Sequence, residues 1–139
     1  VASRQAERYL DLAPIAVMVD LETGHRVVPG AAERLEEEAE SVGDARLGAA
    51  PPALLEAALA AARKEADAIL ARRKEEALEA LDAHYQGEEM RLVEAGFGGG
   101  ASRAAIEAAL HALRHHREVT GRALDRLKLG LEAAAVVVP

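Results

Sequence analysis

Two long stretches of the chain carry apolar residues at the spacing of an α-helix. The first, predicted as a helix over residues 51–95, has no glycine or proline between 53 and 85, and its apolar side chains recur at intervals of three, four or their multiples. The members of this face are Leu55, Leu59, Ala62, Ala66, Ile69, Ala77, Leu81 and Tyr85. The second, predicted over residues 102–131, starts at Ser102, a good N-cap residue. Its face consists of Ile106, Leu110, Leu113, Arg117, Thr120, Leu124, Leu127 and Leu131. The two faces predict coiled-coil-like packing of one helix on the other.

A glycine-rich segment separates the two predicted helices. Residues 96–100 read Gly-Phe-Gly-Gly-Gly, and glycine readily ends a helix and turns the chain. Pro51 and Pro52 suit the first turn of the longer helix. Gly87 lies within that helix, at a cost of about 1 kcal/mol. Two helices of matching period joined by a short turn predict an antiparallel helical hairpin.

The two ends of the chain have the β-branched composition of short strands. Residues 14–20 run Pro-Ile-Ala-Val-Met-Val-Asp and precede a turn sequence, so we place a strand region at 9–30, with residues 25–28 as a candidate hairpin partner. Residues 133–138, Ala-Ala-Ala-Val-Val-Val, predict a terminal strand. We expect this strand to pair with residues 15–19 at the base of the helical hairpin.

Residues 31–43 predict a short acidic helix between these segments. Pro29 and Gly30 precede it, and three glutamates at 36–38 indicate a solvated face. For a chain of 139 residues we expect one domain, over 1–139. The predicted fold class is α+β, mostly α: a long antiparallel helical hairpin with a small β-sheet that pairs the N-terminal and C-terminal strands. Because the chain begins with Val1 rather than Met, we interpret it as an accessory domain excised from a larger protein.

The composition limits the function. Half of the residues are hydrophobic, and the aromatic residues are only Tyr9, Tyr85 and Phe97, so small side chains suited to close helix packing dominate. Cysteine is absent, which excludes disulfides and thiolate chemistry. The net charge of -7 argues against a chain that clamps nucleic acid as a whole. No apolar run approaches the roughly 20 residues of a membrane helix, so we expect no membrane partner, and the lack of cysteine fits an intracellular protein.

Residues with catalytic or metal-binding chemistry are sparse. His111 and His115 lie one helical turn apart, but no carboxylate stands at a convincing third position, so we assign no metal site. The glycine-rich turn lacks the Lys-Ser/Thr of a phosphate-binding loop. Paired glutamates at 75–76 and 88–89 are expected on an exposed helix, where nothing raises a pKa toward catalytic use. We therefore expect no catalytic residue, no cofactor site and no metal site in this chain.

The candidate partner-binding residues are Phe97, Met90 and Arg114. Phe97 is the only phenylalanine and lies between glycines in the predicted turn, where an exposed ring suits docking into a partner. Arg114 belongs to a locally basic second helix, which suits either a phosphate group or an acidic protein. Ion pairing with the first helix is the favoured interpretation of that basic helix.

Several segments together resemble a known family. They are Tyr9-Leu10, the run from Pro14 to Asp20, the helical sequence from Ala61 to Asp67 (Ala-Ala-Arg-Lys-Glu-Ala-Asp), and the passage from Leu124 into the Val-rich end at Val138. In this order they resemble the C-terminal domain of the bacterial RNA polymerase-associated, SWI/SNF-type ATPases, the RapA or HepA type. The resemblance extends over about residues 9–138, and residues 87–103 depart from it.

The resemblance implies what the chain and its parent protein do. The parent would be an ATP-dependent helicase or translocase, a DNA-binding ATP hydrolase that uses ATP and Mg and acts in the bacterial cytoplasm near the nucleoid. It would free RNA polymerase for reuse in transcription, although a related helicase of defence or repair fits the same match. This chain would be its non-catalytic accessory domain, in contact with RNA polymerase and with other domains of the parent. None of the family's helicase motifs is present, so no catalytic residue is carried over.

Two alternative functions stay open. The richness of residues 60–79 in Ala, Glu, Arg and Lys is typical of a stator-stalk coiled-coil subunit of a rotary ATPase. Such stalks usually continue as one helix, whereas a glycine-rich turn intervenes here. The other alternative is a helical metal- or ligand-binding module that uses His111, His115 and His116.

Overall fold

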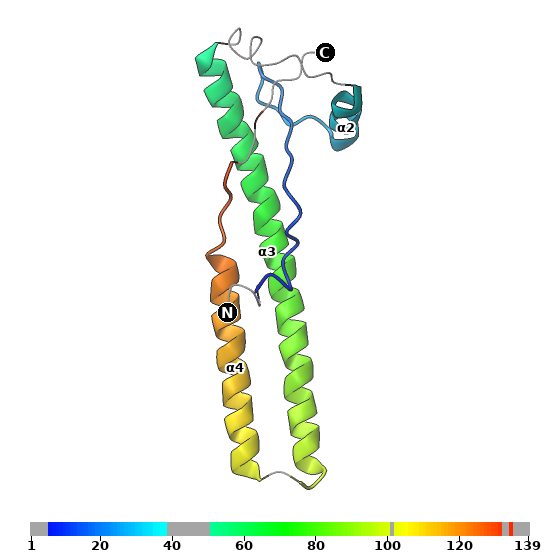
Figure 1. The fold of residues 1–139 in the computed structure, drawn as a ribbon, viewed down its shortest axis with the longest axis vertical. Helices are drawn as coiled ribbons and strands as arrows, with labels where there is room; N and C mark the ends of the chain where they lie inside the picture. The colour runs from blue at the N-terminus through cyan, green and yellow to red at the C-terminus, as the bar shows by residue number, and fades with distance from the viewer. Residues whose placement is uncertain (1–5, 39–50, 101, 132–133, 135–139) are drawn as a thin grey trace. The chain divides into compact units, whose positions relative to one another are not determined.

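The computed structural model describes residues 6–38, 51–100, 102–131 and 134. Its helices are α2 (Pro29–Glu38), α3 (Pro52–Phe97) and α4 (Arg103–Asp125), shown in Figure 1. The chain divides into two compact units. The hairpin unit contains residues 6–13 and 71–128, and the second unit contains the described residues of 14–70 and 129–134. α3 contributes to both units, because its residues 52–70 belong to the second unit and its residues 71–97 to the hairpin unit.

α3 confirms the long helix predicted from the apolar spacing. The amides of Leu54 and Leu55 donate to the Pro51 carbonyl at 3.0 and 3.2 Å, so Pro52 lies in the first turn, where a missing N–H leaves no bond unmade. The helix continues through Gly87 and ends at Phe97. Its 46 residues span about 69 Å at the standard rise per residue.

The glycine-rich turn joins α3 and α4 as predicted, and the two helices run antiparallel within the hairpin unit (Figure 1). The Gly98 amide donates to the Glu94 carbonyl at 3.1 Å, and Gly99 has a φ of +89°, a backbone angle that glycine adopts without strain. Ser102 is the N-cap of α4, and its hydroxyl accepts from the Ala105 amide at 3.2 Å. These local contacts reverse the chain within a few residues.

One apolar core holds the hairpin unit together. Its buried members are Ala6, Leu10, Ala77, Leu81, Tyr85 and Leu124. Thr120 is also fully buried, and its hydroxyl donates to the His116 carbonyl at 2.9 Å, which satisfies the polar group. The N-terminal segment therefore packs against both helices, because it supplies Ala6 and Leu10 to the same core.

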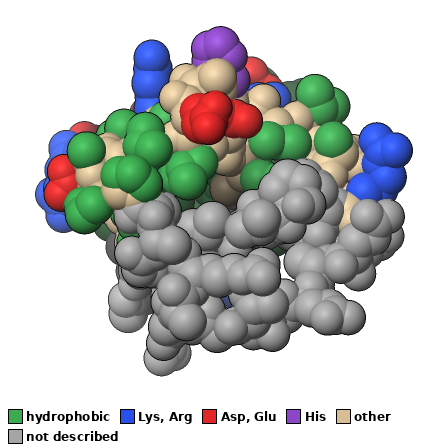
Figure 2. All heavy atoms as spheres, turned by 90° about the horizontal axis from the view of Figure 1, so that it is seen from above, with side chains coloured by type: hydrophobic (Ala, Val, Ile, Leu, Met, Phe, Trp, Pro, Cys, Tyr) green, Lys and Arg blue, Asp and Glu red, His purple; other side chains and the backbone are tan. Residues whose placement is uncertain are grey.

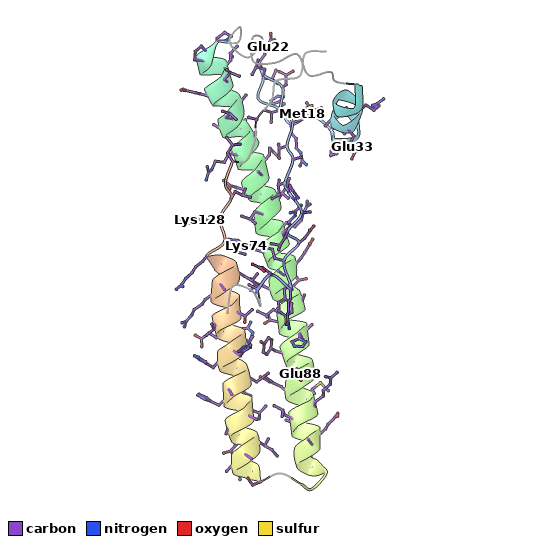
Figure 3. The ribbon with its side chains drawn as sticks, viewed as in Figure 1. Met18, Glu22, Glu33, Lys74, Glu88 and Lys128 are labelled. Atoms are coloured by element: carbon purple, nitrogen blue, oxygen red, sulfur yellow. The ribbon has the colours of Figure 1, made fainter. Side chains whose placement is uncertain are left out.

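α4 is shorter than the helix predicted over 102–131, and it ends at Asp125. The Lys74 ammonium of α3, labelled in Figure 3, donates to the carbonyls of Asp125 at 3.0 Å and Leu127 at 2.6 Å. In a longer helix these carbonyls would accept hydrogen bonds from amides of the next turn. Leu131, the last residue assigned to the apolar face, is consequently outside the helix and 72% exposed. Burial along α3 also differs from the prediction at one place, because Leu59 is exposed and its neighbour Ala58 is buried.

The prediction of an α+β fold with a small sheet was wrong. The structure is nearly all helical, with 69% of the described residues in helices and no sheet among them. Residues 18–20 and 25–27 lie opposite each other but form a single antiparallel bridge, between Val19 and Arg26. A two-stranded ribbon of this length is marginal without a third strand. Of the predicted terminal strand at 133–138, the structure describes only residue 134, which forms no β-bridge. The other residues of this predicted strand lie outside the described residues.

The short acidic helix begins earlier than predicted. α2 starts at Pro29 rather than at residue 31, and the amides of Ala31 and Ala32 donate to the Val28 carbonyl at 2.9 and 3.0 Å. Pro29 and Gly30, interpreted from the sequence as a break, instead form the first turn, a position that proline tolerates well. The predicted end of this helix, at 39–43, lies outside the described residues. No helix in the described part of the chain is long and apolar enough to cross a membrane.

Candidate functional site

The predicted partner-binding residues all lie in the hairpin unit, and two of them share one face of α3. Phe97, the last residue of α3, is 88% exposed, and Met90 is 63% exposed. They are seven residues apart, which is about two helical turns. Val93 falls between them and is also exposed, so the spacing is i, i+3, i+7. We call Met90, Val93 and Phe97 the tip stripe.

The tip stripe is exposed because α3 uses a different face to contact α4. A Cβ atom built on Gly96 would lie 2.5 Å from Ile106 Cδ1, so Gly96 is the point of closest approach to α4 near the turn. At 3.6 residues per turn, the tip stripe lies roughly 100° around the helix from Gly96. α4 therefore leaves these three apolar side chains uncovered. Phe97 and Met90 were candidates from the sequence, whereas Val93 was missed, although the helical spacing of the other two would have indicated it.

Arg114 lies in an ion pair rather than in the tip stripe. Its Nε is 3.1 Å from Glu89 Oε1 across the hairpin, and Arg117 Nε donates to Asp82 Oδ1 at 2.6 Å in the same way. The prediction that the basic residues of the second helix pair with the first is thus confirmed for these two arginines. The other two arginines near the turn pair within their own helices, Arg91 with Glu88 and Arg103 with Glu107.

The electrostatics of the hairpin end follow from these pairs. Residues 82–117 carry four arginines and five acidic residues, and each arginine pairs with one acid. Such exposed pairs add little stability, about 0 to 1 kcal/mol each, but they neutralise the charge of both partners. Residues 82–117 therefore carry no excess of positive charge for a phosphate backbone. Figure 2 looks onto the opposite end of α3, and the described side chains on that face are also a mixture of basic, acidic and hydrophobic types.

A hollow of about 380 Å³ lies in the hairpin unit, on a part of the surface that the sequence analysis did not single out. Its lining residues are Arg8, Tyr9, His84, Tyr85, Glu88, Leu113 and His116, and Figure 3 shows Glu88 on α3. The Tyr85 hydroxyl and His116 Nδ1 are 2.6 Å apart, and the Tyr9 and His84 rings lie 6.0 Å apart. Burial raises the pKa of Tyr9, and the proximity of Tyr85 adds to the rise. The hollow thus lies where the N-terminal segment, through Tyr9, meets α3 and α4.

The histidines of α4 lie in different surroundings. His111 and His115 are both exposed, one turn apart, as their spacing predicts. Among the described residues there is no group of three or more His, Cys, Asp or Glu side chains that could hold a metal ion. His116 instead faces Tyr85 across the hairpin.

Comparison with models of protein families found no match, and neither the curated proteins nor the solved structures gave a significant match.

Proposed function

We propose that this chain is a non-catalytic accessory domain of a SWI/SNF-type ATPase that associates with RNA polymerase and promotes its recycling. The ATPase chemistry, with its ATP and Mg, belongs to other domains of the parent protein. The role of this chain is mechanical: it presents a stiff helical hairpin to RNA polymerase and to the neighbouring domains of the motor.

The observation that carries the proposal is the shared core of the hairpin unit. Leu10, from the N-terminal part of the resembling sequence, and Leu124, from its C-terminal part, are both buried in the core that contains Leu81 of α3. Segments more than a hundred residues apart thus meet on one helix. Both ends of the stretch that carries the resemblance therefore belong to one compact unit, which supports a single accessory domain over these residues.

The hairpin favours an accessory domain over a stator stalk. A stalk subunit continues its helix into a dimeric coiled coil, whereas α4 folds back on α3 and covers its apolar face at Ala77, Leu81 and Tyr85. Over these residues the apolar face of α3 is filled from within the same chain, so this part is not available to a second helix. The interhelical bond from Tyr85 to His116 and the pair from Asp82 to Arg117 add polar specificity to this intramolecular pairing.

The proposal is tested with the parent protein, intact and with this chain deleted. DNA-stimulated ATP hydrolysis is measured first, and we expect the deletion to retain it, because the motor is elsewhere. Multiple-round transcription by purified RNA polymerase is measured next, and we expect the stimulation by the parent to fall to the level without it. Unchanged stimulation by the deletion variant would contradict the proposal, and loss of ATP hydrolysis would assign the chain a role in folding the motor instead.

A further inference from the structure

We infer that the tip stripe of Met90, Val93 and Phe97 docks into an uncharged apolar groove of a folded protein whose rim carries a basic residue facing Glu94. The inference rests on the proposed function, in which that protein is RNA polymerase. It specifies the contact surface and the chemistry of the partner.

The apolar part of the inference follows from exposure and register. The three side chains lie on consecutive turns of one helix face, and Phe97 keeps 88% of its surface in contact with solvent. Anchors at i, i+3 and i+7 are the pattern with which a helix enters a hydrophobic groove. A rigid ring at a fixed helix end loses little conformational freedom on binding, and aromatic anchors of this kind carry most of the energy in many interfaces.

The charges around the stripe favour a protein partner over nucleic acid or an anionic membrane. Binding to nucleic acid or to an anionic membrane requires cations that are available for phosphates. All four arginines of residues 82–117 are paired with acids of the same unit, and this region contains no lysine. The uncompensated formal charge there is negative, since five acids face four arginines. The partner surface is therefore apolar, and any charge on its rim is positive.

The position of Glu94 argues against a second copy of the chain as the occupant. Glu94 is exposed, four residues after Met90 and three before Phe97, at the edge of the stripe. None of the ion pairs between described residues includes it. A two-fold pairing of two stripes centred on Val93 would bring the two Glu94 carboxylates near each other, and like charges at close range are unfavourable. A different protein with a lysine or arginine on its rim has no such cost.

The test measures binding of purified core RNA polymerase to the fluorescently labelled chain, with each substitution also made in the parent protein. We expect Phe97→Ala to raise the Kd at least tenfold and Met90→Ala to raise it several-fold. Glu94→Lys should also raise the Kd, and the increase should shrink as salt is added, because the rim contact is electrostatic. Leu12→Ala is the matched control, since Leu12 is apolar, 61% exposed and in the same unit but off the stripe, and its Kd should stay within twofold. Circular dichroism checks that each variant keeps its helices.

The possible outcomes separate the inference from the proposed function. Binding that none of the tip variants weakens would overturn the inference and leave the accessory function standing. Absence of binding by both the chain and the parent would overturn the two together. Three other results would overturn the inference by identifying another occupant: concentration-dependent dimers, binding to duplex DNA, and binding to anionic vesicles. Each counts only if Phe97→Ala abolishes it. A photo-crosslinker at position 97 that attaches to an apolar groove bordered by lysine or arginine would support it.

Discussion

Leu81 is the side chain whose truncation tests the hairpin most directly. It is completely buried in the core between α3, α4 and the N-terminal segment. Leu81→Ala removes three carbon atoms, which costs about 2.4 kcal/mol in transfer free energy at roughly 0.8 kcal/mol per carbon. A cavity term adds on the order of 1 kcal/mol, because the two helices collapse only in part. We therefore expect the free energy of unfolding of the hairpin unit to fall by about 3 kcal/mol.

The assay is urea denaturation followed by circular dichroism, with two matched variants. Leu12→Ala makes the same chemical change in the same unit, but Leu12 is 61% exposed, so its cost should stay below about 1 kcal/mol. Gly121→Ala makes the opposite change on the facing helix. A Cβ there would lie 3.8 Å from Leu81 Cδ2 and 3.9 Å from Leu78 Cδ2, which are ordinary contacts, so the variant should gain about 0.5 to 1 kcal/mol from helix propensity. A loss below about 1 kcal/mol for Leu81→Ala, or equal losses at Leu81 and Leu12, would refute this packing.

Three further predictions concern a glycine, a lysine and an aspartate. Gly87→Ala should raise the free energy of unfolding by about 1 kcal/mol in urea denaturation, because no side chain or other segment lies within 4 Å of the added Cβ. An unchanged or lower value would count against an uninterrupted α3. Lys74→Met should destabilise the hairpin unit by about 1 to 3 kcal/mol, because two carbonyls lose a charged hydrogen-bond donor. Amide hydrogen exchange in the last turn of α4 should become faster, and unaltered exchange there would contradict this prediction. The Asp20 carboxylate accepts hydrogen bonds from the Thr23 amide and hydroxyl and from the amide of residue 22, which hold its pKa below the ordinary value of 3.8. A lowered pKa means that the carboxylate stabilises its turn above pH 3.8 and that this stabilisation is lost as the pH falls through the lowered value; NMR titration should show this shift, and a midpoint at or above 3.8 would disprove the bonding.

The elements that could be predicted are those specified by local pattern. Residues 53–85 lack glycine and proline and repeat apolar side chains at helical spacing, so α3 follows from propensity and periodicity alone. Ser102 ahead of a helical sequence predicts a cap, and the glycine run at 96–100 predicts a reversal, because each acts through bonds to its near neighbours in the chain.

The elements that could not be predicted depend on partners distant in the sequence. Residues 15–19 have strand composition, but a strand needs an edge to pair with, and among the described residues Val19 finds only Arg26. The end of α4 at Asp125 depends on Lys74, fifty-one residues earlier, whose ammonium takes the carbonyl bonds at that point. In the candidate site, the sequence predicted that basic residues of the second helix pair with the first, but it did not predict that Arg114 pairs with Glu89. The register of α4 on α3 determines which of these side chains meet.

The sequence by itself therefore determined the helices, their joining turn and the apolar faces that bring them together, because helical periodicity and capping act over three or four residues. Only the tertiary structure decided which apolar residues remain outside. Met90, Val93 and Phe97 have the same apolar character as the core residues of α3, and they are exposed because Gly96 and Ile106 set the face on which α4 approaches. The same packing brought the N-terminal Leu10 beside Leu124, since burial in a common core depends on the distance in space and is independent of separation along the chain.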